Sequence, residues 1–93
     1  MNRLVIEAVV VERGAMRYTP AGLPALDLRL AHESMVTEAG HPRKVQVELK
    51  AVGIGAMAEG LDRFELGSTH QFAGFMTSQR NGRGIVYHVT ELL

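Results

Sequence analysis

Strict alternation of apolar and polar residues is the feature that most constrains how this chain folds. Residues 44–51 carry an apolar side chain at every second position and a polar one at the others. Leu26, Leu28 and Leu30 alternate with polar residues in the same way. A period of two puts successive side chains on opposite faces of a β-strand, whereas a helix has a period near 3.6. Both segments are therefore predicted to be half-buried strands.

Three further segments have the composition of strands. Residues 4–11 are rich in β-branched side chains, and residues 71–78 and 85–92 lie on either side of a turn signal. Gly74 interrupts the first of these two, where a bend at a barrel corner would need it. Between the strands, residues 14–22 are expected to form a loop and residues 37–42 a polar connection.

One segment follows helical spacing instead. Ile54, Met57, Ala58 and Leu61 recur at the intervals of one helix face, in a segment too short and glycine-rich for a stable free helix. The resulting order, β-β-β-α-β-β, is that of the oligonucleotide-binding (OB) fold. The predicted fold class is all-β: a single domain over residues 1–93, a five-stranded Greek-key barrel with a short helical segment between strands 3 and 4. An SH3-like barrel is the nearest competitor, and it lacks that helix.

The composition argues against several classes of protein. The chain has no cysteine, which excludes disulfides and thiolate metal sites. It has neither a signal-peptide pattern nor an apolar run of roughly 20 residues that could span a bilayer, so we expect a cytoplasmic protein without membrane contact. The four histidines lie on separate elements, which predicts no metal site and no cofactor. Nucleophile and phosphate-loop motifs are missing too, so no enzyme is expected.

The run 79–84 points to a charged ligand. Asn81-Gly82 is a strong hairpin signal, and Arg80 and Arg83 flank it with no acid between Ser68 and Thr90. A cationic hairpin tip suits a phosphate backbone, although polar tips also serve solubility alone. The net charge is zero, with ten basic and ten acidic residues, whereas nucleic-acid binders are usually basic. The acids, however, gather at residues 59–65.

Several segments together resemble a known family. They are the opening Asn2-Arg3-Leu4-Val5, Gly22-Leu23-Pro24, the strand end Leu30-Ala31-His32-Glu33-Ser34, the stretch from Ser34 to Gly40 with Arg43, and the hairpin that closes into His88 and Glu91-Leu92. This colinear set resembles the bacterial primosomal replication protein N (PriB) family, within the wider single-stranded DNA-binding protein group. The resemblance implies a homodimer of OB folds that binds single-stranded DNA and bridges the primosomal helicase PriA and a DnaT-like loader protein.

The resemblance also implies where DNA would bind. The loop between strands 4 and 5 gives Arg80, Asn81 and Arg83, and the loop after strand 2 gives Arg43 and Lys44, which have no acid between Glu38 and Glu48. Gln46 and His41 stand where relatives can present an aromatic residue. On the residues alone, Lys50 and Tyr18 are further candidates, since Lys50 shares the polar face of its strand and Tyr18 lies in a loop beside Arg17.

The remaining aromatic residues are expected to have structural roles. Phe64, Phe72 and Phe75 are predicted to pack in the core or a dimer interface, Tyr87 on the barrel surface, and His32 and His88 at strand ends. Because few aromatics are left to stack on bases, binding weaker than in aromatic-lined grooves is expected. The leading hypothesis is a sequence-independent single-stranded DNA-binding protein of the replication-restart primosome that stabilises helicase–DNA assembly. The alternative is a protein-interaction adaptor with weak or incidental DNA affinity.

Overall fold

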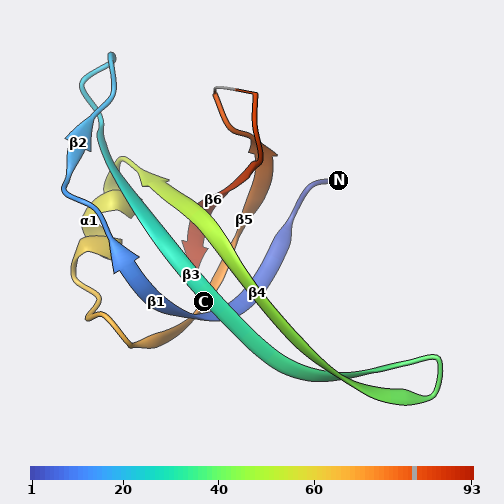
Figure 1. The fold of residues 1–93 in the computed structure, drawn as a ribbon. Coiled ribbons are helices and arrows are strands. Elements are labelled where there is room, and N and C mark those ends of the chain that lie inside the picture. Colours follow the sequence, from blue (N-terminus) through green and yellow to red (C-terminus); the bar gives the residue numbers. More distant parts are fainter. Residues whose placement is uncertain (81) are drawn as a thin grey trace.

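The computed structural model describes residues 1–80 and 82–93, and it is built around one curved, mostly antiparallel sheet with a single helix (Figure 1). Along the chain the elements are β1 (Leu4–Arg13), β2 (Arg17–Tyr18), β3 (Pro24–Glu38), β4 (His41–Ile54), α1 (Ala56–Asp62), β5 (Thr69–Ser78) and β6 (Ile85–Leu92). The two-residue β2 is the only strand that the sequence did not predict in the described residues. Among those residues, no helix is long and apolar enough to cross a membrane.

The sheet closes into a barrel because β1 pairs on both of its sides. Its first half, Leu4 to Val9, pairs antiparallel with β5, and its second half, Val9 to Arg13, pairs with β3. The strands follow the order β1-β5-β6-β4-β3-β2, and the short pairing of β4 with β6 is parallel. Five strands, β1, β3, β4, β5 and β6, thus form the ring, with α1 between β4 and β5. This arrangement confirms the predicted OB-fold barrel.

The core lies inside this ring. Leu26, Leu28 and Leu30 of β3 are buried, as the alternating pattern predicted. Leu61 of α1 is fully buried as well, and a Cβ on Gly53 would lie 2.5 Å from its Cδ1 atom, so glycine there lets the helix close one end of the barrel. The expected surface position of Tyr87 is wrong: its ring is fully buried, and its hydroxyl donates a hydrogen bond to the carbonyl of Leu4 at 2.8 Å.

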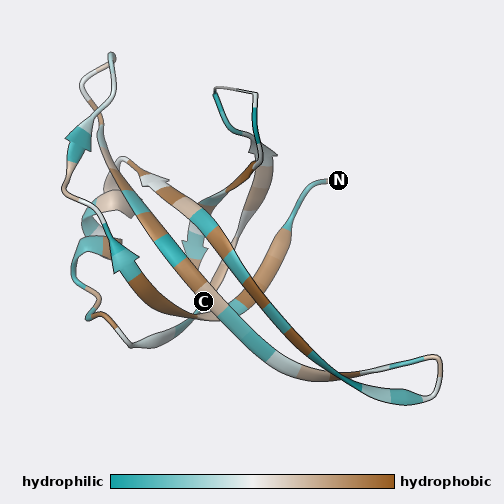
Figure 2. Cartoon of the chain, viewed as in Figure 1, coloured by the Kyte–Doolittle hydropathy of each residue, from teal (hydrophilic) through white to brown (hydrophobic). Residues whose placement is uncertain are grey.

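Beyond the barrel, β3 and β4 continue as a two-stranded arm (Figure 1). Their pairing runs without a break from Ala25 opposite Ile54 to Glu38 opposite His41. Ala39 and Gly40 form the turn, and both have positive φ, +51° and +80°, as a tight two-residue hairpin turn requires. The expected polar connection over residues 37–42 is therefore mostly strand, and its polar character reflects exposure at the arm's tip (Figure 2).

Gly74 produces the bend that its position predicted. The register between β5 and β6 shifts between Ala73 and Gly74, which marks a β-bulge. A Cβ at Gly74 would lie 1.8 Å from the carbonyl oxygen of His88, so only glycine allows the two backbones to approach this closely. After the bulge, Phe75 and His88 are cross-strand partners on the outer face of the sheet.

Candidate nucleic-acid interface

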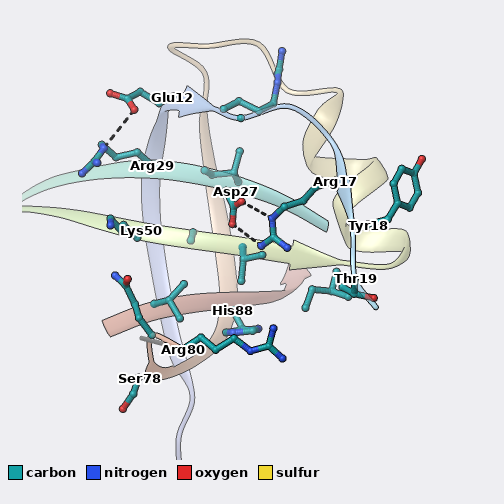
Figure 3. Close-up of a pocket in the computed structure, with 18 of the residues that line it drawn as sticks. Glu12, Arg17, Tyr18, Thr19, Asp27, Arg29, Lys50, Ser78, Arg80 and His88 are labelled. Carbon is teal, nitrogen blue, oxygen red and sulfur yellow. Dashed lines mark hydrogen bonds and ion pairs between the residues drawn. The ribbon is translucent and has the colours of Figure 1, made fainter. Parts of the chain in front are cut away.

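A groove of about 990 Å³ lies on the outer face of the barrel (Figure 3). One wall is the connection from β1 to β3, including residues 17–20, and the other is the β5–β6 hairpin at residues 78–80. The floor comes from β3, β4 and β6. In OB folds this face, between the corresponding two loops, is where oligonucleotides and oligosaccharides bind. The groove is therefore the first place to look for a ligand.

Basic side chains outnumber acidic ones in the lining of this groove. Five of its residues are Arg or Lys and two are acidic, Glu12 and Asp27. The basic residues are Arg13, Arg17, Arg29, Lys50 and Arg80. They reach the groove from β1, β2, β3, β4 and the β5–β6 loop, and the register places Lys50 of β4 directly opposite Arg29 of β3. The result is a local excess of positive charge on a chain whose net charge is zero.

Ion pairs restrain three of these five cations. Arg17 holds Asp27 through two hydrogen bonds, from Nε to Oδ2 at 2.7 Å and from Nη2 to Oδ1 at 3.0 Å (Figure 3). These bonds lower the pKa of Asp27, so its carboxylate stays charged on the groove floor. Arg29 lies 3.6 Å from Glu12 and 3.5 Å from Glu48, and Arg13 lies 3.5 Å from Asp62.

Lys50 and Arg80 differ from these three cations because they form no ion pair in the described part of the chain. Within residues 1–80 and 82–93, no acidic side chain lies within ion-pair distance of either one. Both are exposed, and Lys50 lies on the floor while Arg80 comes from the hairpin wall (Figure 3). They are the cations of the groove that are available to an anionic ligand without first breaking an ion pair.

The structure brings together only some of the residues nominated from the sequence. Tyr18, Lys50 and Arg80 line the same groove, and the Tyr18 side chain is 69% exposed at its rim. Arg83 is exposed in the same β5–β6 loop as Arg80. Asn81, the remaining nominated residue of that loop, lies outside the described residues. The hairpin itself is confirmed, since β5 and β6 flank residues 79–84.

The other four nominated residues, His41, Arg43, Lys44 and Gln46, lie on the arm. The expectation that Arg43 and Lys44 are unopposed is wrong, because the strand register brings acids to them from β3. Arg43 pairs with Glu38, and Lys44 Nζ lies 3.3 Å from a carboxylate oxygen of Glu33.

Gln46 donates to the same Glu33 side chain at 3.1 Å, and this bond together with Lys44 lowers the pKa of Glu33. Lys44 and Gln46 thus share Glu33, Arg43 pairs with Glu38, and none of the four nominated arm residues lines the groove.

Sequence reasoning missed Arg17 and Arg29 as groove residues, and it also missed the ring side chains of His88 and Phe75. Arg29 lies in the outward phase of the Leu26–Leu28–Leu30 pattern, which was the one available signal. His88 is not a strand-end residue but lines the groove from within β6, where burial lowers the pKa of its imidazole.

Phe75, expected in the core or a dimer interface, is 37% exposed on the outer face and stacks on His88. Phe72, by contrast, is fully buried in the core as expected, and Phe64 packs against that core.

A second groove, of about 670 Å³, lies between β1 and the base of the arm. Its lining contains three glutamates, Glu7, Glu33 and Glu48, and no Lys or Arg. It is therefore unsuited to a phosphate backbone. In the described part of the chain, this groove included, no three potential metal ligands lie close enough together to hold an ion.

Comparison with known proteins identifies the family. Residues 2–91 match a family described as another single-strand binding protein family. The replication restart protein PriB of Bordetella pertussis is 52% identical over 80 residues, which cover 86% of this chain and 75% of that protein. The chain belongs to the PriB family. PriB of Nitrosomonas europaea is 33% identical over 91 residues, 97% of this chain and 84% of that protein.

Solved structures agree with this assignment. The structure of PriB from Ralstonia solanacearum matches with a TM-score of 0.92 and 36% identity, over 100% of this chain and 96% of that chain. The single-stranded DNA binding protein of Thermus aquaticus matches with a TM-score of 0.76 and 27% identity, over 100% of this chain and 50% of that chain. The resemblance to the PriB family, and to the single-stranded DNA-binding group around it, is confirmed.

Proposed function

We propose that this protein binds single-stranded DNA without sequence preference, in the groove between the β1–β3 connection and the β5–β6 hairpin, and that it acts in replication restart. The observation that carries the proposal is the convergence of Lys50 and Arg80, both without an acidic partner among the described residues, on the ligand-binding face of an OB fold. Membership of the PriB family supports the role in restart, because the curated relatives are named replication restart proteins.

Binding in this groove would be electrostatic and tolerant of sequence. Lysine and arginine side chains neutralise phosphates and release the counterions condensed on the strand, so the affinity falls as salt rises. Phosphates are the same at every nucleotide, so these contacts carry no sequence information. Arg83 in the same loop and Tyr18 at the rim extend the surface that a strand can follow. The proposed role is binding, not catalysis.

The proposal includes the assembly expected of the family. The protein would act in the cytoplasm as a homodimer that stabilises the helicase PriA on DNA and meets a DnaT-like loader protein. Support for the dimer comes from β1. Over residues 4–8, the edge of this strand that faces away from β5 pairs with no strand of the described chain, and Val5 within this stretch is 51% exposed. An exposed strand edge of this kind is a template for pairing with another chain.

The arm supports a second candidate function, a protein-interaction adaptor with incidental DNA affinity. Met35 and Val36 on the arm are 65% and 44% exposed, and the basic residues around them are already paired with acids. In that case the arm would hold partner proteins, and the groove would contribute little to function.

The test compares two double variants that remove the same charge. Binding to a labelled oligo-dT strand is followed by fluorescence anisotropy at about 50 and 200 mM salt, with Lys50→Gln/Arg80→Gln in the groove and Arg43→Gln/Lys44→Gln on the arm. Each phosphate contact adds about 0.7 to the salt exponent. For contacts that contribute nothing at about 1 M salt, loss of two should weaken binding about 60-fold at about 50 mM and about 10-fold at about 200 mM salt. The arm variant should stay within about twofold of the wild type.

Two results would contradict the proposal. Equal losses of oligo-dT affinity in the two variants would exclude the groove as the specific binding site. No binding by the wild-type protein at 50 mM salt would reject the DNA-binding function itself and favour the adaptor.

A further inference from the structure

Two stacked rings lie beside the groove cations on the outer face of the sheet. The rings of Phe75 and His88 are nearly parallel, with an interplanar angle of 10° and centroids 4.7 Å apart. The register links them to the groove floor, since His88 of β6 is opposite Phe75 of β5 on one side and Val52 of β4 on the other. His88 lines the groove next to Arg80 (Figure 3). The ring pair therefore continues the groove floor toward β5.

The exposure of Phe75 is unusual among the aromatic residues of this chain. The chain has three Phe and two Tyr residues. Phe72 and Tyr87 are fully buried, and Phe64 packs against the core. The two exposed aromatics, Tyr18 and Phe75, are both found at this groove, Tyr18 on its wall and Phe75 through its stack with His88. Of these two, Phe75 is the one that stacks on a ring of the groove floor, His88, which lies next to Arg80 (Figure 3).

We propose that Phe75 and His88 form a base-stacking subsite, in which a nucleobase of a single strand lies on the exposed surface of this ring pair while Lys50 or Arg80 binds a neighbouring phosphate. This inference rests on the proposed function, because it assigns a role to residues of the same groove. Every base has an aromatic face, so stacking here is compatible with binding that ignores sequence. It predicts a discrimination that electrostatics cannot supply: the protein should distinguish a strand with bases from one without them.

The experiment compares an oligo-dT strand with an abasic strand of the same length and phosphate number. Stacking of one base contributes roughly 5-fold to 150-fold in affinity, so the wild type should bind oligo-dT tighter than the abasic strand by a factor in this range. Phe75→Leu should remove most of that ratio without changing the salt dependence, and Phe75→Tyr, which keeps a ring, should preserve it. The matched control is Phe64→Leu, at a second Phe–His stack whose rings do not line the groove. Thermal unfolding of each variant checks that it is folded.

Each outcome of this experiment supports or rejects the stacking subsite, the proposed function or both. A wild type that binds both strands equally overturns the subsite and leaves the proposed function intact. A Phe75→Leu variant that is folded and keeps the full ratio also overturns it. A wild type that binds neither strand at low salt rejects the proposed function and the subsite together. A ratio lost in Phe75→Leu, retained in Phe75→Tyr and unchanged in Phe64→Leu establishes the subsite.

Discussion

Replacing Asp27 with asparagine should strengthen DNA binding, although Asp27 forms the best ion pair in the groove. Its carboxylate accepts both hydrogen bonds of the Arg17 fork, at 2.7 and 3.0 Å, so this guanidinium is occupied in the free protein. The carboxylate also places a negative charge on the groove floor, where a phosphate would come near it. Asp27→Asn removes that charge and one of the two acceptor oxygens, which weakens the hold on Arg17 and makes its guanidinium available to a phosphate. We therefore interpret the Arg17–Asp27 pair as a contact that competes with DNA.

The expected gain follows from counting phosphate contacts. Each contact with a single strand adds about 0.7 to the salt exponent, so one more should steepen the log–log salt slope by about 0.7. For a contact that contributes nothing at 1 M salt, this corresponds to about fivefold tighter binding at 0.1 M and about threefold at 0.2 M. Folding should be little affected, because the side chains of Arg17 and Asp27 are 52% and 56% exposed and such pairs contribute only about 0–1 kcal/mol.

The assay is a salt titration of oligo-dT binding by fluorescence anisotropy between about 50 and 400 mM. Glu59→Gln is the matched control, since Glu59 is an exposed acid on α1 outside the groove and its loss changes the net charge equally. Adding Arg17→Gln to Asp27→Asn should abolish the gain. Unchanged or weaker binding by Asp27→Asn would refute the competition, and an equal gain in Glu59→Gln would show that net charge alone is responsible.

Two predictions concern stability. Tyr87→Phe removes the partly buried hydrogen bond to the Leu4 carbonyl and should lower the free energy of unfolding by about 1 kcal/mol, or the melting temperature by about 4–8 °C; an unchanged melting curve would contradict this. Burial lowers the pKa of His88 below its ordinary value of 6.5, so the unfolded chain binds the proton more readily, and stability should decline as the pH falls from 6.5 through the folded-state pKa. Denaturant midpoints at pH 7 and pH 5 should differ less in His88→Gln; an equal difference in the variant would exclude His88 as a cause.

Most of the fold could be predicted because its signals are local. The alternation in β3 and β4, the helical spacing at residues 54–61 and the hairpin run at residues 79–84 each report the structure of the segment that contains them. The length of the arm could not be predicted, because its outer part is exposed on both faces and lacks a clear apolar phase. Its tight turn uses Ala39 with φ of +51°, a position where sequence rules expect Asn, Asp or Gly.

The site was harder to predict because the groove is made by tertiary contacts. Arg80 and Lys50 could be nominated one at a time, but nothing in the sequence placed residues 17, 29, 50 and 80 around one groove. The error about Arg43 and Lys44 has the same origin. Glu38 and Glu33 oppose them only through the cross-strand register, which is not visible from the charges along one strand.

Zero net charge is compatible with the proposed function because most of the charge is neutralised locally. Arg3, Arg13, Arg17, Arg29, Arg43 and Lys44 all lie within ion-pair distance of an acid. At about 0.1 M salt, exposed charges are screened beyond about 10 Å, so a strand approaching the protein would experience the groove and not the balance of the whole chain. Such a chain gains little long-range attraction for DNA, so under the proposed function its affinity would come from direct contacts at Lys50, Arg80 and the ring pair. Base stacking should therefore account for a larger share of the binding free energy here than in a strongly basic protein of the same fold.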